Sequence, residues 1–117
     1  MPTVHILDTF QRQLDRVVKK YPLSKTRIDE EIKALVKNPR QGDKYPGFGG
    51  LEVRKIRMPL TEYSIGKSKG LRLIFIVIKD NTEIVPLVIY QKKRFSSESE
   101  IKKLVMESIQ EVHREIM

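Results

Sequence analysis

The sequence predicts an α+β protein in which a mostly antiparallel β-sheet packs against an N-terminal helical hairpin, with one more helix at the C-terminus. Three observations lead to this prediction. Apolar residues recur at helical spacing in the first third of the chain, three strand-like runs fill the middle, and helical spacing returns after residue 97. The expected order is strand, helix, helix, three strands and helix. Because a chain of 117 residues buries one modest core, we expect residues 1–117 to form a single domain.

The first third of the chain predicts a short strand and two helices. Residues 3–7 are β-like, and Asp8 is a favourable N-cap for a helix that Pro22 ends. Ser24 is a favourable N-cap for a second helix, which ends at Asn38-Pro39. The apolar stripes are Phe10, Leu14, Val17, Val18 and Tyr21 in the first helix, and Ile28, Ile32, Leu35 and Val36 in the second. Two short helices joined in this way form a hairpin whose apolar sides can lie on a sheet.

The middle of the chain predicts strands at 50–58, 69–79 and 83–91, after an irregular connection rich in glycine and proline over residues 40–50. A tight turn at Asp80-Asn81-Thr82 makes the last two strands an antiparallel hairpin. Pro86 lies inside the last strand and cannot donate a hydrogen bond to a neighbouring strand. We therefore expect a bulge or an unpaired edge at that point.

The C-terminal region predicts a long helix. Ser97 and Glu100 have the spacing of a capping box at its start. The apolar residues that follow lie on one helical face: Ile101, Leu104, Val105, Ile109, Val112 and Ile116. This face either packs on the body of the protein or binds a partner.

The composition excludes several classes of protein. With 39% hydrophobic and 32% charged residues the chain is typical of a globular protein with a charged surface. It has no cysteine, which excludes disulfides and thiolate metal sites, and His5 and His113 are isolated, so we expect no metal and no cofactor. The longest apolar run, residues 73–78, has the length of a strand, and no segment resembles a signal peptide. We expect a cytoplasmic protein that does not enter a membrane.

The positive charge is concentrated in the middle of the chain. Residues 40–94 contain 12 Lys and Arg against 5 Asp and Glu, whereas the rest of the chain contains 11 against 10. A basic surface confined to one region is typical of a protein that binds phosphate groups or nucleic acid. It is equally typical of a solvated strand edge that Lys and Arg protect from aggregation.

The strand around residue 55 predicts where the charges lie. Side chains alternate between the two faces of a strand, so Lys55 and Arg57 point one way while Ile56 and Met58 point the other. Arg72 is the only charge between Leu71 and Ile78, and it is costly there unless its head group reaches solvent or a partner. One face of this hairpin is therefore predicted to be cationic and the other buried.

An ordered set of motifs resembles a known superfamily. The set is the helical hairpin with N-P at its end, G-D-x-x-P-G-x-G-G-L (42–51), V-R-K-I-R (53–57), G-K-S-K-G-L-R-L-I-F (66–75) and V-I-Y-Q-K-K (88–93). Over residues 9–105 it is similar to the RelE/ParE superfamily of bacterial toxin–antitoxin toxins. The runs at 42–51 and 66–70 are most similar to the HigB-like branch. The resemblance implies a small toxin with a RelE-like fold and the topology predicted above.

The resemblance also implies site residues. Lys55 and Arg57 match the basic strand residues of the RelE pattern, and Arg72 matches the arginine that begins the next strand. Lys55 is the implied proton acceptor and the two arginines hold the phosphate, since cations crowded together lower the pKa of a lysine. Tyr90 either stacks on a base of the RNA or closes the core.

Five further cations are candidates for contact with the RNA backbone: Arg54, Lys67, Lys69, Lys92 and Lys93. Lys93 stands where relatives often carry an arginine, and a lysine lacks the bidentate fork. No tyrosine follows Lys93, so the downstream catalytic tyrosine of the RelE type is missing.

Three functions are compatible with the sequence. The first is a ribosome-dependent endoribonuclease toxin that enters the A site, cleaves translated mRNA by metal-independent 2′-OH attack, and is silenced by a cognate antitoxin with an acidic contact surface. The second is a ParE-like toxin that inhibits DNA gyrase without cleaving RNA. The third is a non-catalytic basic domain that binds RNA.

Overall fold

The computed structural model describes residues 2–117 and confirms the predicted α+β fold. The elements are β1 (Thr3–Val4), α1 (Asp8–Lys20), α2 (Ser24–Lys37), β2 (Asp43–Lys44), β3 (Glu52–Met58), the short 3-10 helices η1 (Thr61–Tyr63) and η2 (Lys67–Lys69), β4 (Leu71–Ile78), β5 (Glu83–Gln91) and α3 (Glu98–Glu115). Within the described residues the strands form one sheet in the order β1-β5-β4-β3-β2. Only β1 runs parallel to its neighbour, β5. The short strand β2 lies in the connection that was predicted to be irregular, and its pairing extends the sheet at that edge.

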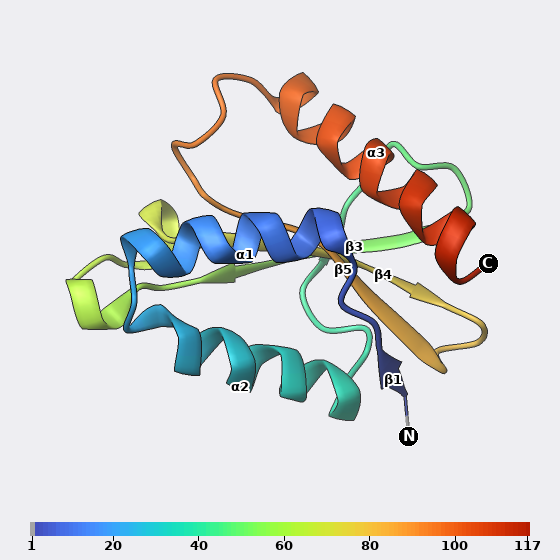
Figure 1. Ribbon diagram of the computed structural model, residues 1–117, viewed down its shortest axis with the longest axis horizontal. Coiled ribbons are helices and arrows are strands. Elements are labelled where there is room, and N and C mark those ends of the chain that lie inside the picture. Colours follow the sequence, from blue (N-terminus) through green and yellow to red (C-terminus); the bar gives the residue numbers. More distant parts are fainter. Residues whose placement is uncertain (1) are drawn as a thin grey trace.

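The helices cover the two faces of the sheet (Figure 1). Helices α1 and α2 pack on one face, through a core that includes Phe10, Leu14, Ile28, Leu35 and Phe75. The apolar stripe of α3 packs on the other face, through a second core that includes Ile74, Val88, Ile101, Val105 and Val112. The predicted apolar side of the C-terminal helix is therefore buried against the body of the protein.

A β-bulge lies in β5 where Pro86 predicted an irregularity. Ile74 pairs with Val88 and the next residue, Phe75, pairs with Pro86, so Leu87 has no partner on β4. The carbonyl oxygens of Leu87 and Leu104 each lie 3.1 Å from the hydroxyl of Ser108, which is 2% exposed and shares its one proton between them. The bulge thus frees a carbonyl that fixes α3 on the sheet.

The starts of the first two helices differ from the predicted caps by one residue. Asp8 and Ser24 are the first helical residues, preceded by Leu7 and Leu23, neither of which has a side-chain cap. At α1 the capping role belongs to Glu111 of α3, whose carboxylate accepts from the backbone N–H of Thr9 at 3.3 Å. Capping preferences consider only residues next to the helix start in sequence, so they do not predict a partner as distant as Glu111.

The hydroxyl of Ser24 donates to the carbonyl of Tyr21 at 2.6 Å, which satisfies the turn between the helices instead. At α3 the predicted cap is confirmed, because the Ser97 hydroxyl accepts from the backbone N–H of Glu100. The carboxylate of Glu100 accepts from the Ser96 hydroxyl, so the reciprocal half of the capping box is not formed with Ser97.

Replacing Ser108 with alanine should lower the free energy of unfolding by about 1–3 kcal/mol, because the buried carbonyl of Leu87 loses its donor. Urea denaturation of the purified protein measures this change. Gln110→Ala is the matched control, since Gln110 is an exposed residue of the same helix, and it should change stability by less than about 0.5 kcal/mol. Equal stability of S108A and Q110A would contradict the role given to the bulge.

Candidate functional site

Three of the predicted site residues form one row across the sheet. In the register of the strands, Arg57 of β3 lies directly opposite Arg72 of β4, and Arg72 lies directly opposite Tyr90 of β5. Residues directly opposite each other point to the same face of a sheet, so all three share the face that α3 partly covers. Lys55 lies two residues before Arg57 on the same strand and shares this face. The structure therefore brings Lys55, Arg57, Arg72 and Tyr90 together.

Arg72 is buried and held by backbone carbonyls. It is 4% exposed, and its guanidinium donates to the carbonyl of Lys67 at 2.7 Å and to that of Ser68 at 3.2 Å. Burial, followed by the charge of Arg57, lowers the pKa of Arg72. We expected the charge of Arg72 to reach solvent or a partner, and the structure shows that its partners are the carbonyls of η2 instead of a carboxylate.

Gly70 allows η2 to approach the sheet closely. A Cβ atom at this position would lie 2.1 Å from the carbonyl oxygen of Met58 at the end of β3. The carbonyl of Gly70 accepts from the backbone N–H of Lys92 at 3.0 Å. The absence of a side chain at Gly70 therefore places the η2 carbonyls over Arg72 and ties the segment after β5 to the same turn.

Lys55 is half-buried in positive surroundings. Burial is the main cause that lowers the pKa of Lys55, and the charges of Arg57, Arg72 and Lys92 lower it further, while Glu98 opposes the shift. A lowered pKa makes the neutral amine, the form that can accept a proton, available at lower pH than for an ordinary lysine. None of the three strand cations Lys55, Arg57 and Arg72 forms an ion pair within residues 2–117.

Tyr45 and Glu98 also belong to this site, although the sequence did not indicate them. The hydroxyl of Tyr45 donates to a carboxylate oxygen of Glu98 at 2.6 Å, and the ring of Tyr45 is stacked on Phe48. The ammonium of Lys55 lies 5.1 Å from the centre of this ring, and that of Lys102 lies 5.8 Å from it. Burial, and then Glu98, raise the pKa of Tyr45. The pair joins the first residue of α3 to the wall of the cationic site.

Tyr90 is a buried residue whose ring packs at a steep angle, 72°, to the ring of Phe95. It is 3% exposed and the two ring centres are 5.3 Å apart. Burial raises the pKa of Tyr90 to about 12, so its hydroxyl is protonated at neutral pH. The face of this ring is enclosed, which leaves the hydroxyl, rather than a stacking surface, as the group that could act in the site.

The other predicted cations divide between two sides of the sheet. Lys92 is exposed and its charge acts on Lys55, whereas Lys93 lies in a groove against α1. Lys67 and Lys69 are exposed on η2. Arg54 is directed to the opposite face from Lys55, where it pairs with Glu52 at 2.7 Å and donates to the carbonyls of Gln41 and Gly42. The structure does not bring Arg54 together with the others.

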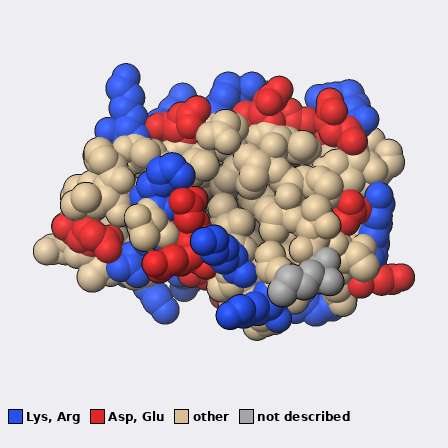
Figure 2. Space-filling view, turned by 60° about the horizontal axis from the view of Figure 1, so that its bottom comes forward, with Lys and Arg blue, Asp and Glu red and all other residues tan. Residues whose placement is uncertain are grey.

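Some of the charges elsewhere on the surface are paired, such as Lys25 with Asp29 and Arg27 with Glu62. Figure 2 shows a face on which Lys and Arg side chains alternate with Asp and Glu around a broad area without charge. His5 is paired with Glu83 at 2.9 Å. Within residues 2–117 no three His, Cys, Asp or Glu side chains are grouped so that they could hold a metal ion. The same residues include no helix long and apolar enough to cross a membrane.

Comparison with known proteins supports the fold. No protein-family model and no curated protein matches this chain. Among solved structures, the isolated E. coli RelE toxin superposes with a TM-score of 0.57 and 18% sequence identity, over 88% of this chain and 97% of that chain. The chain therefore has a RelE-like fold, as the resemblance to the RelE/ParE superfamily implied. The HigB-like branch remains a prediction.

The pKa of Lys55 should lie below its ordinary value of 10.5 when it is measured by NMR titration of the lysine side chains. Arg57→Gln should raise this pKa because it removes a neighbouring positive charge, and Glu98→Gln should lower it further because it removes the opposing negative charge. Arg27→Gln is the control, since Arg27 pairs with Glu62 away from the site. A pKa of Lys55 that does not respond to Arg57→Gln would contradict the proximity described here.

Proposed function

We propose that this protein is the toxin of a type II toxin–antitoxin system and acts as a ribosome-dependent endoribonuclease on translated mRNA. One observation carries the proposal: Arg57 and Arg72 lie opposite each other beside a half-buried Lys55, and within the described residues none of the three lies within ion-pair distance of a carboxylate. Such a site is suited to a group with several negative oxygens. The RelE-like fold supports the same conclusion.

The proposed reaction is cleavage of the RNA backbone by its own 2′-OH group. The 2′-oxygen attacks the adjacent phosphorus while its proton passes to the neutral amine of Lys55, and a pentacoordinate phosphorane forms with an additional negative charge. The bond from phosphorus to the 5′-oxygen then breaks, and the departing 5′-oxygen takes a proton from water. The products are a 2′,3′-cyclic phosphate and a 5′-hydroxyl.

The arginines are assigned to stabilise the phosphorane. Arg57 is exposed and can present its guanidinium to two phosphate oxygens. Arg72 is fixed by the η2 carbonyls and contributes a charge that needs no reorganisation during the reaction. We assign the hydroxyl of Tyr90, which is protonated at neutral pH, as a hydrogen-bond donor to the departing 5′-oxygen.

Further contacts are assigned from the positions of the remaining cations. Lys67, Lys69 and Lys92 are exposed on the η2 turn and after β5, where they can contact the RNA backbone. Arg54 is omitted because its head group is held by Glu52 and two carbonyls on the other face. The proposed partners are the ribosome with its mRNA and a cognate antitoxin with an acidic contact surface.

Lys55→Arg should abolish growth arrest and reduce mRNA cleavage by at least about 100-fold, because arginine keeps the charge but does not accept a proton near neutral pH. Arg57→Ala and Arg72→Ala should relieve growth arrest as well. Growth after induction and primer extension on a translated message measure both effects. Lys37→Ala, at the exposed end of α2, is the control and should remain toxic.

Two outcomes would replace this proposal. Arrest with an intact message and DNA-damage signalling would indicate a ParE-like inhibitor of gyrase. RNA binding without toxicity would indicate a non-catalytic RNA-binding domain.

Because Arg72 is buried, circular dichroism of Arg72→Ala and the milder Arg72→Lys must first show a folded protein. Full toxicity of all folded variants at equal expression would contradict the assigned site.

A further inference from the structure

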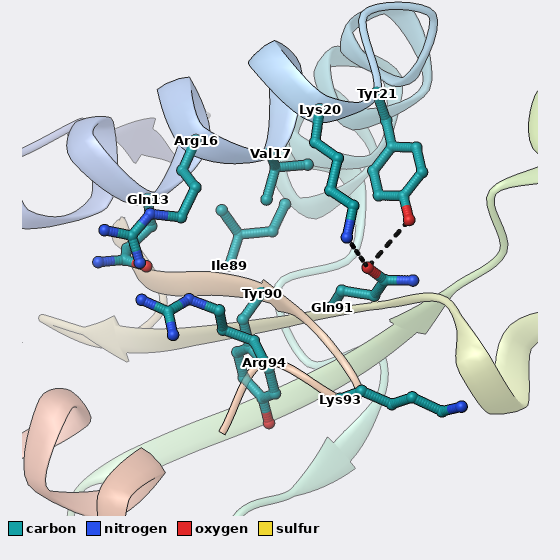
Figure 3. Close-up of a pocket in the computed structure, with 10 residues that line it drawn as sticks. All are labelled: Gln13, Arg16, Val17, Lys20, Tyr21, Ile89, Tyr90, Gln91, Lys93 and Arg94. Carbon is teal, nitrogen blue, oxygen red and sulfur yellow. Dashed lines mark hydrogen bonds between the residues drawn. The ribbon is translucent and has the colours of Figure 1, made fainter. Parts of the chain in front are cut away.

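A second basic surface lies on the opposite side of the sheet from the site described above. It is a groove between α1 and the end of β5, with a cavity volume of about 150 Å³. Val17 and Ile89 form its apolar floor, and four cations surround it: Arg16, Lys20, Lys93 and Arg94. Figure 3 shows Arg16 and Lys20 reaching down from α1 and Arg94 extending toward Arg16 from the segment after β5, while the Lys93 side chain points outward from the rim. We call this the α1–β5 groove.

The cations of the groove are without acidic partners. Within residues 2–117, none of the four lies within ion-pair distance of a carboxylate, and no Asp or Glu lines the groove. Lys20 and Tyr21 both donate to the side-chain oxygen of Gln91, at 3.5 and 3.0 Å, which fixes one end of the groove. Four unpaired cations around a cavity favour a ligand with several negative charges.

The floor indicates the chemistry of the uncharged part of the ligand. A nucleobase is usually bound by stacking on a flat aromatic side chain, but Val17 and Ile89 are branched and aliphatic. Tyr21 is packed edge-on against Tyr63 with ring centres 4.9 Å apart, and Tyr90 packs against Phe95 on the other side. An aliphatic floor of this size is suited to one apolar amino-acid side chain.

We propose that the α1–β5 groove binds an acidic peptide segment of a partner protein, with one apolar side chain on Val17 and Ile89 and flanking carboxylates on the four cations. Charge complementarity argues for this occupant over a neutral or basic peptide. Glu100 and Glu107 line the next hollow beyond Arg16 and Arg94, so the acidic segment is expected to leave the groove toward Lys93 and Lys69. The inference concerns a different face from the RNA-cleavage site and requires no cleavage of RNA, and it rests only on the part of the proposed function that assigns an acidic protein partner.

The groove is linked to the cationic site through the backbone. Tyr90, Gln91, Lys93 and Arg94 line the α1–β5 groove, and the charge of Lys92, between them in sequence, acts on Lys55. One short segment therefore contributes to both the groove and the cationic site. A peptide held in the groove would restrain the segment that also carries Lys92.

The test uses a fluorescein-labelled peptide in which one leucine is flanked on each side by three glutamates. A second peptide has serine in place of leucine, and hexauridylate serves as the nucleic-acid probe. Fluorescence anisotropy with the full-length protein should show that the leucine peptide binds at least about tenfold more tightly than the serine peptide, because only leucine buries apolar surface. Arg16→Glu combined with Arg94→Glu should weaken binding at least about tenfold.

Arg12→Glu is the matched control, since Arg12 is an exposed residue one turn earlier on α1 and does not line the groove. It should change binding by less than about twofold. Three results would overturn the proposal: equal binding of the two peptides, equal weakening by Arg12→Glu and by the groove variant, or displacement of the leucine peptide by hexauridylate. Each result is independent of growth arrest and of mRNA cleavage, so either proposal can fail while the other stands.

Discussion

Two arginines directly opposite each other on neighbouring strands are the constraint on which the site depends. The register of β3 and β4 places Arg57 across from Arg72, and like charges in this position destabilise a sheet. Arg72 is also almost completely buried, which adds a cost of desolvation. The protein offsets part of this cost with the carbonyls of η2, and Gly70 permits their close approach. It does not use a carboxylate, which would cancel the charge. The repulsion between Arg57 and Arg72 is therefore best explained if the two arginines bind a negatively charged ligand.

The electrostatics of the site follow from the same arrangement. Lys55 is half-buried beside these arginines, so its protonated form is disfavoured, while Glu98 supplies the opposing charge. Glu98 is itself held by the Tyr45 hydroxyl, which ties the start of α3 to the sheet. The balance of charge at Lys55 therefore depends on the docking of α3 as well as on the strands. Further along α3, the contact of Ser108 with the bulge in β5 fixes the same helix to the sheet.

Much of this could be predicted from the sequence because the signals are local. The alternation along β3 placed Lys55 and Arg57 on one face, the lone charge in β4 identified Arg72, and Pro86 predicted the bulge. The residues that were missed are joined by contacts distant in sequence. Tyr45 lies in a stretch without periodicity and meets Glu98 only in the folded chain, and Glu111 replaces a local cap at α1. Arg54 was predicted as a site residue because it is next to Lys55 in sequence, but it lies on the opposite face of the sheet.

The most direct test of the central claim is the stability of Arg57→Gln compared with its toxicity. If Arg57 serves to bind a negative ligand, its charge lowers the stability of the folded protein. Removing this charge should then raise the free energy of unfolding by about 0.2–1 kcal/mol, and growth arrest should be lost. Urea denaturation and growth after induction measure the two quantities on the same variant. A variant that is less stable than the original protein, or one that is as toxic, would contradict the account.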